Sequence, residues 1–543
     1  MSFVPDTQNK EFQDALNLIQ YTRQSVFLTG KAGTGKSTFL KYICANTKKK
    51  HVVLAPTGIA AINAGGSTLH SFFKLPFYPL LPDDPNFSLQ RGRIHEFFKY
   101  TKPHRKLLEE LELVIIDEIS MVRADIIDAV DRILRVYSRN LREPFGGKQI
   151  LLVGDVFQLE PVVKGDEREI LNRFYPTPYF FSARVFGQID LVSIELQKVY
   201  RQTDSKFIHV LDHIRNNTVG SAELQLLNTR YGTQIEQSEA DMYITLATRR
   251  DNVDYINDKK LAELPGDPVT FYGEIMGDFP ESSLPTSQEL VLKPGAQIIF
   301  IKNDFDRRWV NGTIGVISGF DPIEETLYVI TDDGKECDVK RESWRNIRYK
   351  YNEEKKQIEE EELGTFTQYP VRLAWAITVH KSQGLTFSRV VIDFTGGVFA
   401  GGQAYVALSR CTSLEGIQLK KPISRADVFV RPEIVSFSER FNNRTAIDRA
   451  LKQAQADVQY VAAAKAFDKG DFGTFLDEFF KAIHSRYDIE KPNVQRLIRR
   501  KLNIINRLKE ENRALKQAAL EKEKALVKYA REYILMGLSL IHI

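Results

Sequence analysis

Residues 30–37 carry the motif that most constrains what this chain can fold into. Their sequence, GKAGTGKS, matches the phosphate-binding pattern G-x-x-x-x-G-K-[ST] in full. An apolar run at 25–30 precedes the motif, and a helical pattern at 36–47 follows it. In this order, a strand, a glycine-rich loop and a helix surround a phosphate group with backbone N–H groups. The sequence therefore predicts an α/β domain that binds a nucleotide.

The residues of this loop have separate predicted roles. Lys36 is expected to reach the β- and γ-phosphates, and Ser37 to bind Mg²⁺. Thr38 begins the following helix and is expected to hold the α-phosphate. Further contacts with the phosphates are expected from the backbone of the loop, at Gly33, Thr34 and Gly35. ATP and Mg²⁺ are therefore the predicted cofactors.

Two carboxylates end a second apolar run, LELVIIDE at 111–118. Asp117 is expected to hold Mg²⁺, and Glu118 to act as the general base on the attacking water. The pair favours hydrolysis, because a kinase needs only the first carboxylate. Gln158 follows a third apolar run, at 148–155, and is expected to orient water or contact the γ-phosphate. A plain polar loop residue is the alternative for Gln158.

Apolar runs and turn signals divide the chain into regions. The first part alternates buried strands with helical segments, which predicts a parallel sheet covered on both faces. A Pro- and aromatic-rich stretch at 75–106 interrupts this alternation and is interpreted as a small insertion. A second sheet is expected from Ile244 and resumes at 371–380, and short strands at about 291–369 predict an inserted β-barrel. From about Arg431 the pattern is helical.

Composition excludes several classes of protein. With 43% hydrophobic and 27% charged residues among 543, the chain is not mainly disordered. Its three cysteines lie far apart, so neither a disulfide framework nor a zinc ribbon is expected, and a reducing compartment fits. There is no long apolar run and no signal-peptide pattern at the N-terminus, so we expect a cytoplasmic protein without a membrane partner.

One pair of histidines has a spacing that can bind zinc. His209 and His213 stand four residues apart on a predicted helix. Because no third ligand is evident in the sequence, we interpret them as a pair on a helix surface.

Seven segments along residues 5–420 form an ordered series. They are GKAGTGKS, LAPTGIAA, GGSTLHSFF, VIIDEISMV, LLVGDVFQLEPV, AITVHKSQGLTF and AYVALSRCTSLEGI. Their order and spacing resemble the motifs of superfamily-one helicases, specifically the Pif-one family of DNA helicases in subgroup B, which moves 5′ to 3′. The RecD branch resembles them less well, because VYRQ at 199–202 and TGIAA followed by GGSTLHSFF favour Pif-one. A bacterial member of this family is expected.

The resemblance implies two RecA-like P-loop domains with the ATP site between them. Arg201, in VYRQ, and Arg410, in ALSR, match the two arginines that the second domain supplies. Such cations stabilise charge on the transferring phosphoryl group when the cleft closes. Gly384, in KSQG, matches the loop that links the cleft to DNA. Gln8 matches the glutamine that reads adenine, with Gln13 as the alternative.

The resemblance also implies contacts with single-stranded DNA on both domains. Thr57, His70 and Phe72 match the contact positions of the first domain, and Thr378 and His380 those of the second. A single strand requires neutralised phosphates and platforms for stacking. Packing of His70 or Phe72 beneath the loop is the alternative. The implied substrates are single-stranded DNA and forked or tailed duplex, with G-quadruplex or RNA–DNA hybrid as further candidates, in replication, recombination or repair.

The combined expectation is a two-domain motor with insertions and an extension. The expected regions are 1–74 and 107–195 for the first RecA-like domain, 75–106 for a wedge insertion in it, 196–312 and 370–435 for the second RecA-like domain, 313–369 for its SH3-like β-barrel insertion and 436–543 for a helical extension. The wedge is expected to split duplex DNA at the junction. The core is expected to be monomeric.

The extension is basic and weakly informative. Residues 491–531 hold 13 Lys and Arg against 4 Asp and Glu, although the net charge of the whole chain is only +4. Apolar residues fall at coiled-coil-like positions, with Asn512 placed to fix the register. Three roles stay open: packing as an independent or intramolecular helical module, self-association through this helix, and an extra surface for DNA.

Two other functions fit parts of the sequence. A non-motor P-loop ATPase switch would use the phosphate loop but has no need for Arg201, Arg410 or the TVHKSQG segment. An RNA helicase would share the motor, and nothing in the sequence reads a 2′-hydroxyl group. Strong stimulation of ATP hydrolysis by single-stranded DNA distinguishes the motor from the switch.

Overall fold

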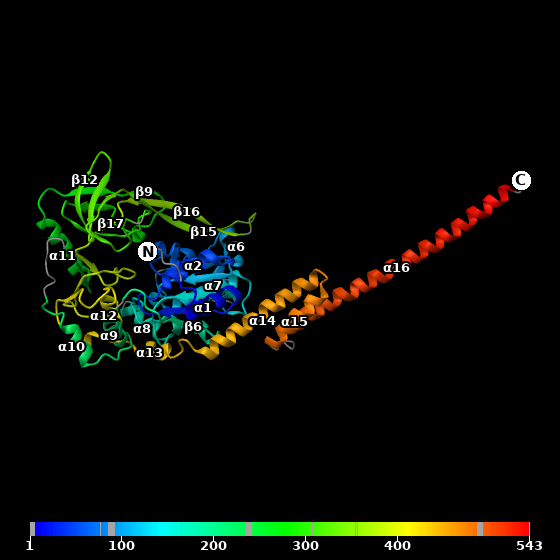
Figure 1. The fold of residues 1–543 in the computed structure, drawn as a ribbon, viewed down its shortest axis with the longest axis horizontal. Helices are drawn as coiled ribbons and strands as arrows, with labels where there is room; N and C mark the ends of the chain where they lie inside the picture. The colour runs from blue at the N-terminus through cyan, green and yellow to red at the C-terminus, as the bar shows by residue number, and fades with distance from the viewer. Residues whose placement is uncertain are drawn as a thin grey trace. The chain divides into compact units, whose positions relative to one another are not determined.

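The computed structural model describes residues 6–76, 78–84, 93–163, 165–202, 204–233, 242–306, 308–352, 354–355, 357–485 and 492–541. The chain divides into two compact units, Met1–Leu451 and Lys452–Ile543. Figure 1 shows sheets and helices in the first unit and helices alone in the second. No helix within these ranges is long and apolar enough to cross a membrane.

A six-stranded parallel sheet forms the first domain, in the order β3-β2-β4-β5-β1-β6. Its strands are β1 (Val26–Gly30), β2 (His51–Ala55), β3 (Ser67–Thr68), β4 (Leu113–Ile116), β5 (Gln149–Val153) and β6 (Val192–Leu196). Val26 and Leu28 pack in one cluster with Phe39, whereas Phe27 packs in another with Ile127. Successive strand residues therefore bury opposite faces, which confirms the predicted parallel sheet covered on both sides.

Helices supply the two covering layers. One cluster draws on α1 (Lys10–Tyr21) and α2 (Lys36–Asn46), and the other on α4 (Leu69–Phe73), α6 (Lys102–Glu110) and α7 (Ala124–Tyr137). Shorter helices, α3 (Gly58–Ala64), α5 (Arg93–Phe97) and α8 (Gly165–Leu171), lie in the connections. The phosphate loop thus runs from β1 directly into α2, as its motif predicts.

The described part of the stretch 75–106 is built into this first domain. Leu80, Phe98 and Tyr100 are buried in the same cluster as α7. The backbone N–H of Leu80 donates to Asp125 at 2.9 Å, and the Tyr137 hydroxyl donates to the Phe98 carbonyl at 2.9 Å. These residues are therefore core, and of the expected insertion 75–106 only residues 77 and 85–92 lie outside the described residues. The role of the wedge stays a prediction.

A second, smaller parallel sheet forms the second domain, in the order β18-β7-β19-β20. Its strands are β7 (Ile244–Ala247), β18 (Ala376–Thr378), β19 (Val390–Asp393) and β20 (Ile417–Leu419). The helices of this domain are α9 (Ser205–Arg215), α10 (Ser221–Asn228), α11 (Arg250–Glu263) and α12 (Gln403–Leu408). α9 and α12 pack in one apolar cluster with strands of the sheet. The carboxyl end of β18 carries the TVHKSQG segment.

A β-rich module interrupts the second domain, and it is larger than expected. Short strands were expected from about 291 and the insertion itself from 313, but strands begin at Val269. The module consists of β8 (Val269–Tyr272), β9 (Glu274–Gly277), β10 (Glu289–Leu292), β11 (Gln297–Phe300), β12 (Ile314–Asp321), β13 (Thr326–Thr331), β14 (Glu336–Val339), β15 (Glu342–Asn352), β16 (Gln357–Gln368) and β17 (Val371–Leu373). Because β11 pairs with β12 on one side and β17 on the other, the boundaries 312/313 and 369/370 both cut a single sheet.

The long hairpin β15–β16 connects this module with the first domain. Its Ile347 and Tyr349 are buried in the first domain's core cluster. The backbone N–H of Val53 donates to the Tyr349 hydroxyl at 3.4 Å, and β15 lies beside α6, as Figure 1 shows. The hairpin therefore fixes the β-module against the domain that carries the phosphate loop.

The segment after 435 begins inside the core of the first unit. Phe437, on α13 (Pro432–Ser438), stacks on Phe181 with ring centroids 4.3 Å apart. The side chain of Asn442 bonds the backbone N–H and carbonyl of Glu195 at 2.8 Å and 3.0 Å. Ile447, on α14 (Arg444–Asp468), is buried with β1. The expected boundary at 436 is therefore wrong, since these residues complete the first domain's fold.

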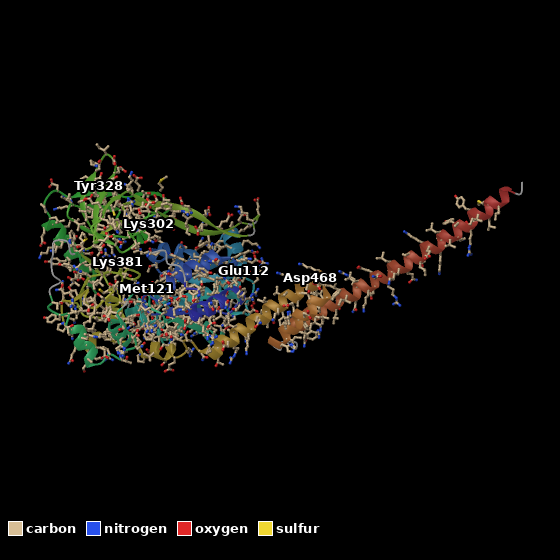
Figure 2. All side chains as sticks on the ribbon, in the orientation of Figure 1. Glu112, Met121, Lys302, Tyr328, Lys381 and Asp468 are labelled. Carbon is tan, nitrogen blue, oxygen red and sulfur yellow. The ribbon has the colours of Figure 1, made fainter. Side chains whose placement is uncertain are left out.

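The second unit is wholly helical in its described residues. It comprises the rest of α14, α15 (Phe472–Ser485) and α16 (Pro492–Ile541). Tyr460 packs on Phe479, and Lys501 of α16 pairs with Asp468. Every described side chain of α16 from 506 to 538 is exposed, and the sticks of Figure 2 stand out along its length. The expected helical extension is present, and its role stays open.

Candidate active site

One cavity of about 590 Å³ lies between the two domains. The predicted residues that line it are Gly33, Thr34, Gly35, Lys36, Ser37, Thr38, Glu118 and Gln158 from the first domain and Arg201, Gly384 and Arg410 from the rest of the chain. Residues distant in sequence by hundreds of positions thus meet around the phosphate loop. Asn311, Gly312 and Thr313 of the β-module also line it, a contact that the sequence did not reveal.

The glycines of the phosphate loop are required by its geometry. Gly33 and Gly35 have φ of +80° and +90°, a left-handed conformation that favours glycine. A Cβ on Gly33 would lie 2.4 Å from the Cβ of Arg201. The Lys36 ammonium donates to the carbonyls of Gly30 at 2.6 Å and Lys31 at 3.0 Å. The loop backbone therefore accepts hydrogen bonds from its own lysine, and at Gly33 it lies directly against Arg201.

Glu118 has the environment of a general base. It follows β4 with φ 50° and ψ 43°, a strained conformation for a residue with a side chain. Burial raises its pKa to about 7, and the Asp117 carboxylate adds to the rise, while Lys36 and Arg410 oppose it. A base is most effective when its pKa lies near the working pH. The position and the pKa of Glu118 both suit proton transfer from water.

Asp117 lies beside the cavity and is not among the residues that line it. Its carboxylate accepts the backbone N–H of Glu118 at 2.9 Å. Burial raises its pKa, and Lys36 lies close enough to oppose that rise. Together with the Ser37 hydroxyl on the cavity wall, the carboxylate offers hard oxygen donors, which Mg²⁺ prefers. The residues present therefore fit the predicted ion.

Two arginines face the phosphate loop from the other side. Arg410 is only 2% exposed and donates to the Val406 carbonyl at 3.0 Å. Arg201 donates to the Ser409 carbonyl at 3.2 Å. Burial and the neighbouring Arg201 cation lower the pKa of Arg410 to about 9. Within the described residues neither guanidinium donates to a carboxylate, so an anionic phosphoryl group would offset the cost of burying two cations.

Neither candidate for reading adenine lines the cavity. Gln8 and Gln13 are both exposed. The Gln13 amide donates to the Thr7 carbonyl at 2.7 Å, whereas Gln8 lies two residues from Asp6. Asp6 accepts the hydroxyl of Tyr200 at 3.0 Å, and Tyr200 is part of the cavity wall. The choice between Gln8 and Gln13 therefore stays a prediction.

Thr57 and His70 lie in a separate groove of about 440 Å³. Residues of the β-module, including Phe279 and Arg345, form its other wall. The Thr57 hydroxyl accepts the backbone N–H of Ala60 at 3.2 Å, which caps α3. An exposed groove with a cationic side chain suits a single strand, and the assignment of these two residues to DNA stays a prediction.

Phe72 is a correction to the sequence prediction. Its side chain is 4% exposed and packs on Phe73, with ring centroids 4.8 Å apart. Tyr349 of the β15–β16 hairpin also packs on it, with ring centroids 6.0 Å apart. The ring therefore presents no free face to a base. It is held beneath the loop because α4 points it into the first domain's core.

The second predicted pair lies on the second domain and does not line the groove of Thr57. Thr378 ends β18, is 9% exposed, and accepts the backbone N–H of Lys381 at 3.2 Å. Burial lowers the pKa of His380. The His380 ring stacks on Phe399, which is 59% exposed. Phe399 was not expected, and it supplies an exposed aromatic platform beside His380.

Sequence reasoning also missed a set of polar contacts between the two domains. Arg215 of α9 pairs with Asp155 at 3.1 Å and Glu195 at 2.8 Å, and its guanidinium is almost fully buried. One turn earlier, Asp212 pairs with Lys31 of the phosphate loop at 2.6 Å. Asp155 ends the apolar run at 148–155, but no role was predicted for it from the sequence. Its partners come from α9, so only the tertiary structure identifies them.

The second domain also reaches the phosphate loop through a tyrosine. The hydroxyl of Tyr405, on α12, accepts the backbone N–H of Ala32 at 2.9 Å. Gly402 precedes that helix, and a Cβ there would lie 2.3 Å from the Gln158 carbonyl. α9 and α12 therefore both contact the nucleotide-binding elements of the first domain.

Comparison with known proteins identifies relatives of this chain. A family model described as PIF1-like helicase matches residues 4–225. The human ATP-dependent DNA helicase PIF1 is 34% identical over 417 residues, which cover 73% of this chain and 58% of the human protein. The chain thus spans little more than half the length of that relative. A crystal structure of Bacteroides Pif1 in complex with ADP-AlF4 is 42% identical, covers 79% of this chain and 96% of that one, and has a TM-score of 0.72.

The Bacteroides protein bound to ssDNA gives a lower TM-score, 0.58, at the same 42% identity, covering 80% of this chain and 97% of that one.

Proposed function

Because this chain belongs to the PIF1-like helicase family, we propose that it is an ATP-hydrolysing DNA helicase that moves 5′ to 3′ on single-stranded DNA and unwinds duplex. The observation that carries the proposal is the cavity shared by both domains. Lys36 and Glu118 enter it from one side and Arg201 and Arg410 from the other. A P-loop switch needs only the first pair. The second pair makes hydrolysis depend on the approach of the second domain.

The side chains divide the chemistry between them. Lys36 neutralises the β- and γ-phosphates, and Glu118 accepts a proton from the attacking water, with Gln158 orienting that water. Ser37 and Asp117 would hold Mg²⁺, which would supply further charge neutralisation. Arg201 and Arg410 stabilise negative charge that develops on the phosphoryl group. Because both arginines are largely desolvated, their attraction for that charge is stronger than it would be in water.

Closure of the cleft is proposed to drive movement along DNA. Arg215 and Asp212 of α9 form ion pairs across the domain boundary, and such contacts break when the domains separate. Candidate DNA contacts lie on both sides of that boundary, at Thr57 and His70 and at Thr378 and His380. If the closed and open states hold these two surfaces with different strength, each ATP advances the chain along one strand.

The proposed partners are single-stranded DNA and forked or tailed duplex. Bacteroides Pif1, at 42% identity, has been crystallised with ssDNA, which supports this substrate class. G-quadruplex and RNA–DNA hybrid are further candidates, and the proposed setting is replication, recombination or repair in a bacterial cytoplasm. The comparisons favour Pif-one over the RecD-like and switch alternatives.

Hydrolysis assays with and without single-stranded DNA test this proposal. The wild-type chain should hydrolyse ATP much faster when single-stranded DNA is present. Lys36→Ala should be inactive under both conditions, because the phosphate cation is lost. A wild-type rate that does not respond to DNA would favour a switch and contradict the motor.

A further inference from the structure

Three side chains on the outer part of the second domain converge in the structure. His209 and His213 project from α9 one turn apart, with ring centroids 4.3 Å apart. Glu223, in the first turn of α10, brings its carboxylate to them, and all three potential ligand atoms lie within 4.8 Å of one another. Over the residues that the structure describes, no other group of three His, Cys, Asp or Glu side chains meets this distance. The third ligand absent from the local sequence thus comes from the next helix.

Hydrogen bonds already orient two of these side chains. The Nδ1 atom of His213 lies 3.2 Å from the Thr218 carbonyl and 3.1 Å from the Thr218 hydroxyl. A ring N–H bonded to a backbone carbonyl leaves Nε2 as a lone-pair donor, the arrangement common among metal-binding histidines. One oxygen of Glu223 accepts the backbone N–H of Gly220 at 2.8 Å.

We propose that His209, His213 and Glu223 form a binding site for a divalent transition-metal ion, with Zn²⁺ the best match. Two imidazoles and one carboxylate suit zinc, copper, nickel or cobalt, whereas Mg²⁺ and Ca²⁺ prefer oxygen donors alone. Ligand atoms in a tetrahedral zinc site lie roughly 3.3 Å apart, given metal–ligand distances of about 2.0 Å. Small rotations of the exposed His209 side chain close that gap. Water takes the fourth position.

The site lies on the helix that contacts the first domain. Asp212 and Arg215, which pair with Lys31 and with Asp155, share α9 with the two histidines. An ion held by His209, His213 and Glu223 would tie α9 to α10 and restrict the movement of α9. The metal site does not depend on the proposed helicase activity, because it uses neither ATP nor DNA.

Calorimetric titration of the full-length chain with Zn²⁺, without nucleotide or DNA, tests the site. One ion per chain should bind with a Kd in the micromolar range. His209→Ala and Glu223→Gln should each weaken binding at least about 10-fold, the scale seen for changes around metal ligands. Glu223→Gln keeps an oxygen for the Gly220 N–H, so it removes the charge without removing the helix cap.

His484→Ala is the matched control. His484 is also exposed and its Nδ1 lies 2.7 Å from the Phe480 carbonyl, but it belongs to no such cluster in the described residues. This variant should bind Zn²⁺ as the wild type does. The proposal is overturned if the wild type binds no Zn²⁺ at about 100 μM, or if neither His209→Ala nor Glu223→Gln changes the isotherm. Circular dichroism of each variant confirms that a loss of binding is not a loss of fold.

Discussion

Replacing Arg215 with alanine should slow ATP hydrolysis although Arg215 does not line the nucleotide cavity. Its guanidinium pairs with Asp155 at 3.1 Å and Glu195 at 2.8 Å, and the Asp155 side chain is fully buried. The substitution leaves that carboxylate buried without its cation. Removing one partner of a buried pair costs about 3–5 kcal/mol.

This cost falls on the closed arrangement of the domains, because the carboxylates regain water when the domains separate. A penalty of about 3 kcal/mol on the closed state lowers its population roughly 10²-fold, since each 1.36 kcal/mol is tenfold. We therefore expect kcat for DNA-stimulated hydrolysis to fall by about 10²-fold in Arg215→Ala. Arg215→Lys keeps the charge but loses the planar fork that reaches two carboxylates, so its kcat should fall less.

Steady-state hydrolysis at saturating single-stranded DNA measures this effect, with thermal unfolding followed in parallel. Arg250→Ala is the control, because Arg250 pairs with Asp254 in the same domain while 81% exposed. Exposed pairs contribute little, so its kcat should stay within about twofold of wild type. Wild-type turnover and wild-type melting of Arg215→Ala would refute the role given to this ion pair.

Three further predictions concern the site and the domain boundaries. Glu118→Gln should keep ATP binding but lose turnover by about 10² or more, measured by nucleotide binding and single-turnover hydrolysis; normal turnover would remove Glu118 from the role of base. Arg410→Ala should cost on the order of 10³ in kcat with DNA binding kept, and loss of DNA binding with intact basal hydrolysis would place Arg410 on the DNA side instead. Truncation after Leu451 should leave a stable, active enzyme, whereas truncation at 436 should lower the melting temperature, because it removes Phe437 from the core; equal melting of the two would contradict the revised boundary.

The nucleotide site was the most predictable part of the molecule. A phosphate loop and a carboxylate pair can be recognised in the local sequence, because each lies at the end of a single apolar strand. The roles of Arg201 and Arg410 were inferred from the resemblance alone. In the structure both arginines line the cavity together with the phosphate loop. In contrast, the local sequence does not identify Arg215. A buried arginine on a helix has the same sequence pattern as an exposed one, and only its partners in the tertiary structure distinguish them.

The boundaries were predicted less well, for a physical reason. A β-strand is defined by its partner, and β11 pairs with β17, which follows it by seventy residues of other strands and loops. The local pattern indicated strands only from about 291 and the insertion was expected from 313, so both predicted starts fall after Val269. Phe72 illustrates the same limit: an aromatic in LHSFF is equally suited to stacking on a base or packing in a core. The ring of Tyr349, from the distant hairpin, decides between them.

Strand separation on tailed duplexes tests the central claim most directly. The full-length chain, with ATP and Mg²⁺, should unwind a duplex that carries a 5′ single-stranded tail and leave the same duplex with a 3′ tail intact, and Lys36→Ala should unwind neither. Unwinding of the 3′-tailed duplex alone, or DNA-stimulated hydrolysis without unwinding of either, would contradict a 5′-to-3′ DNA helicase.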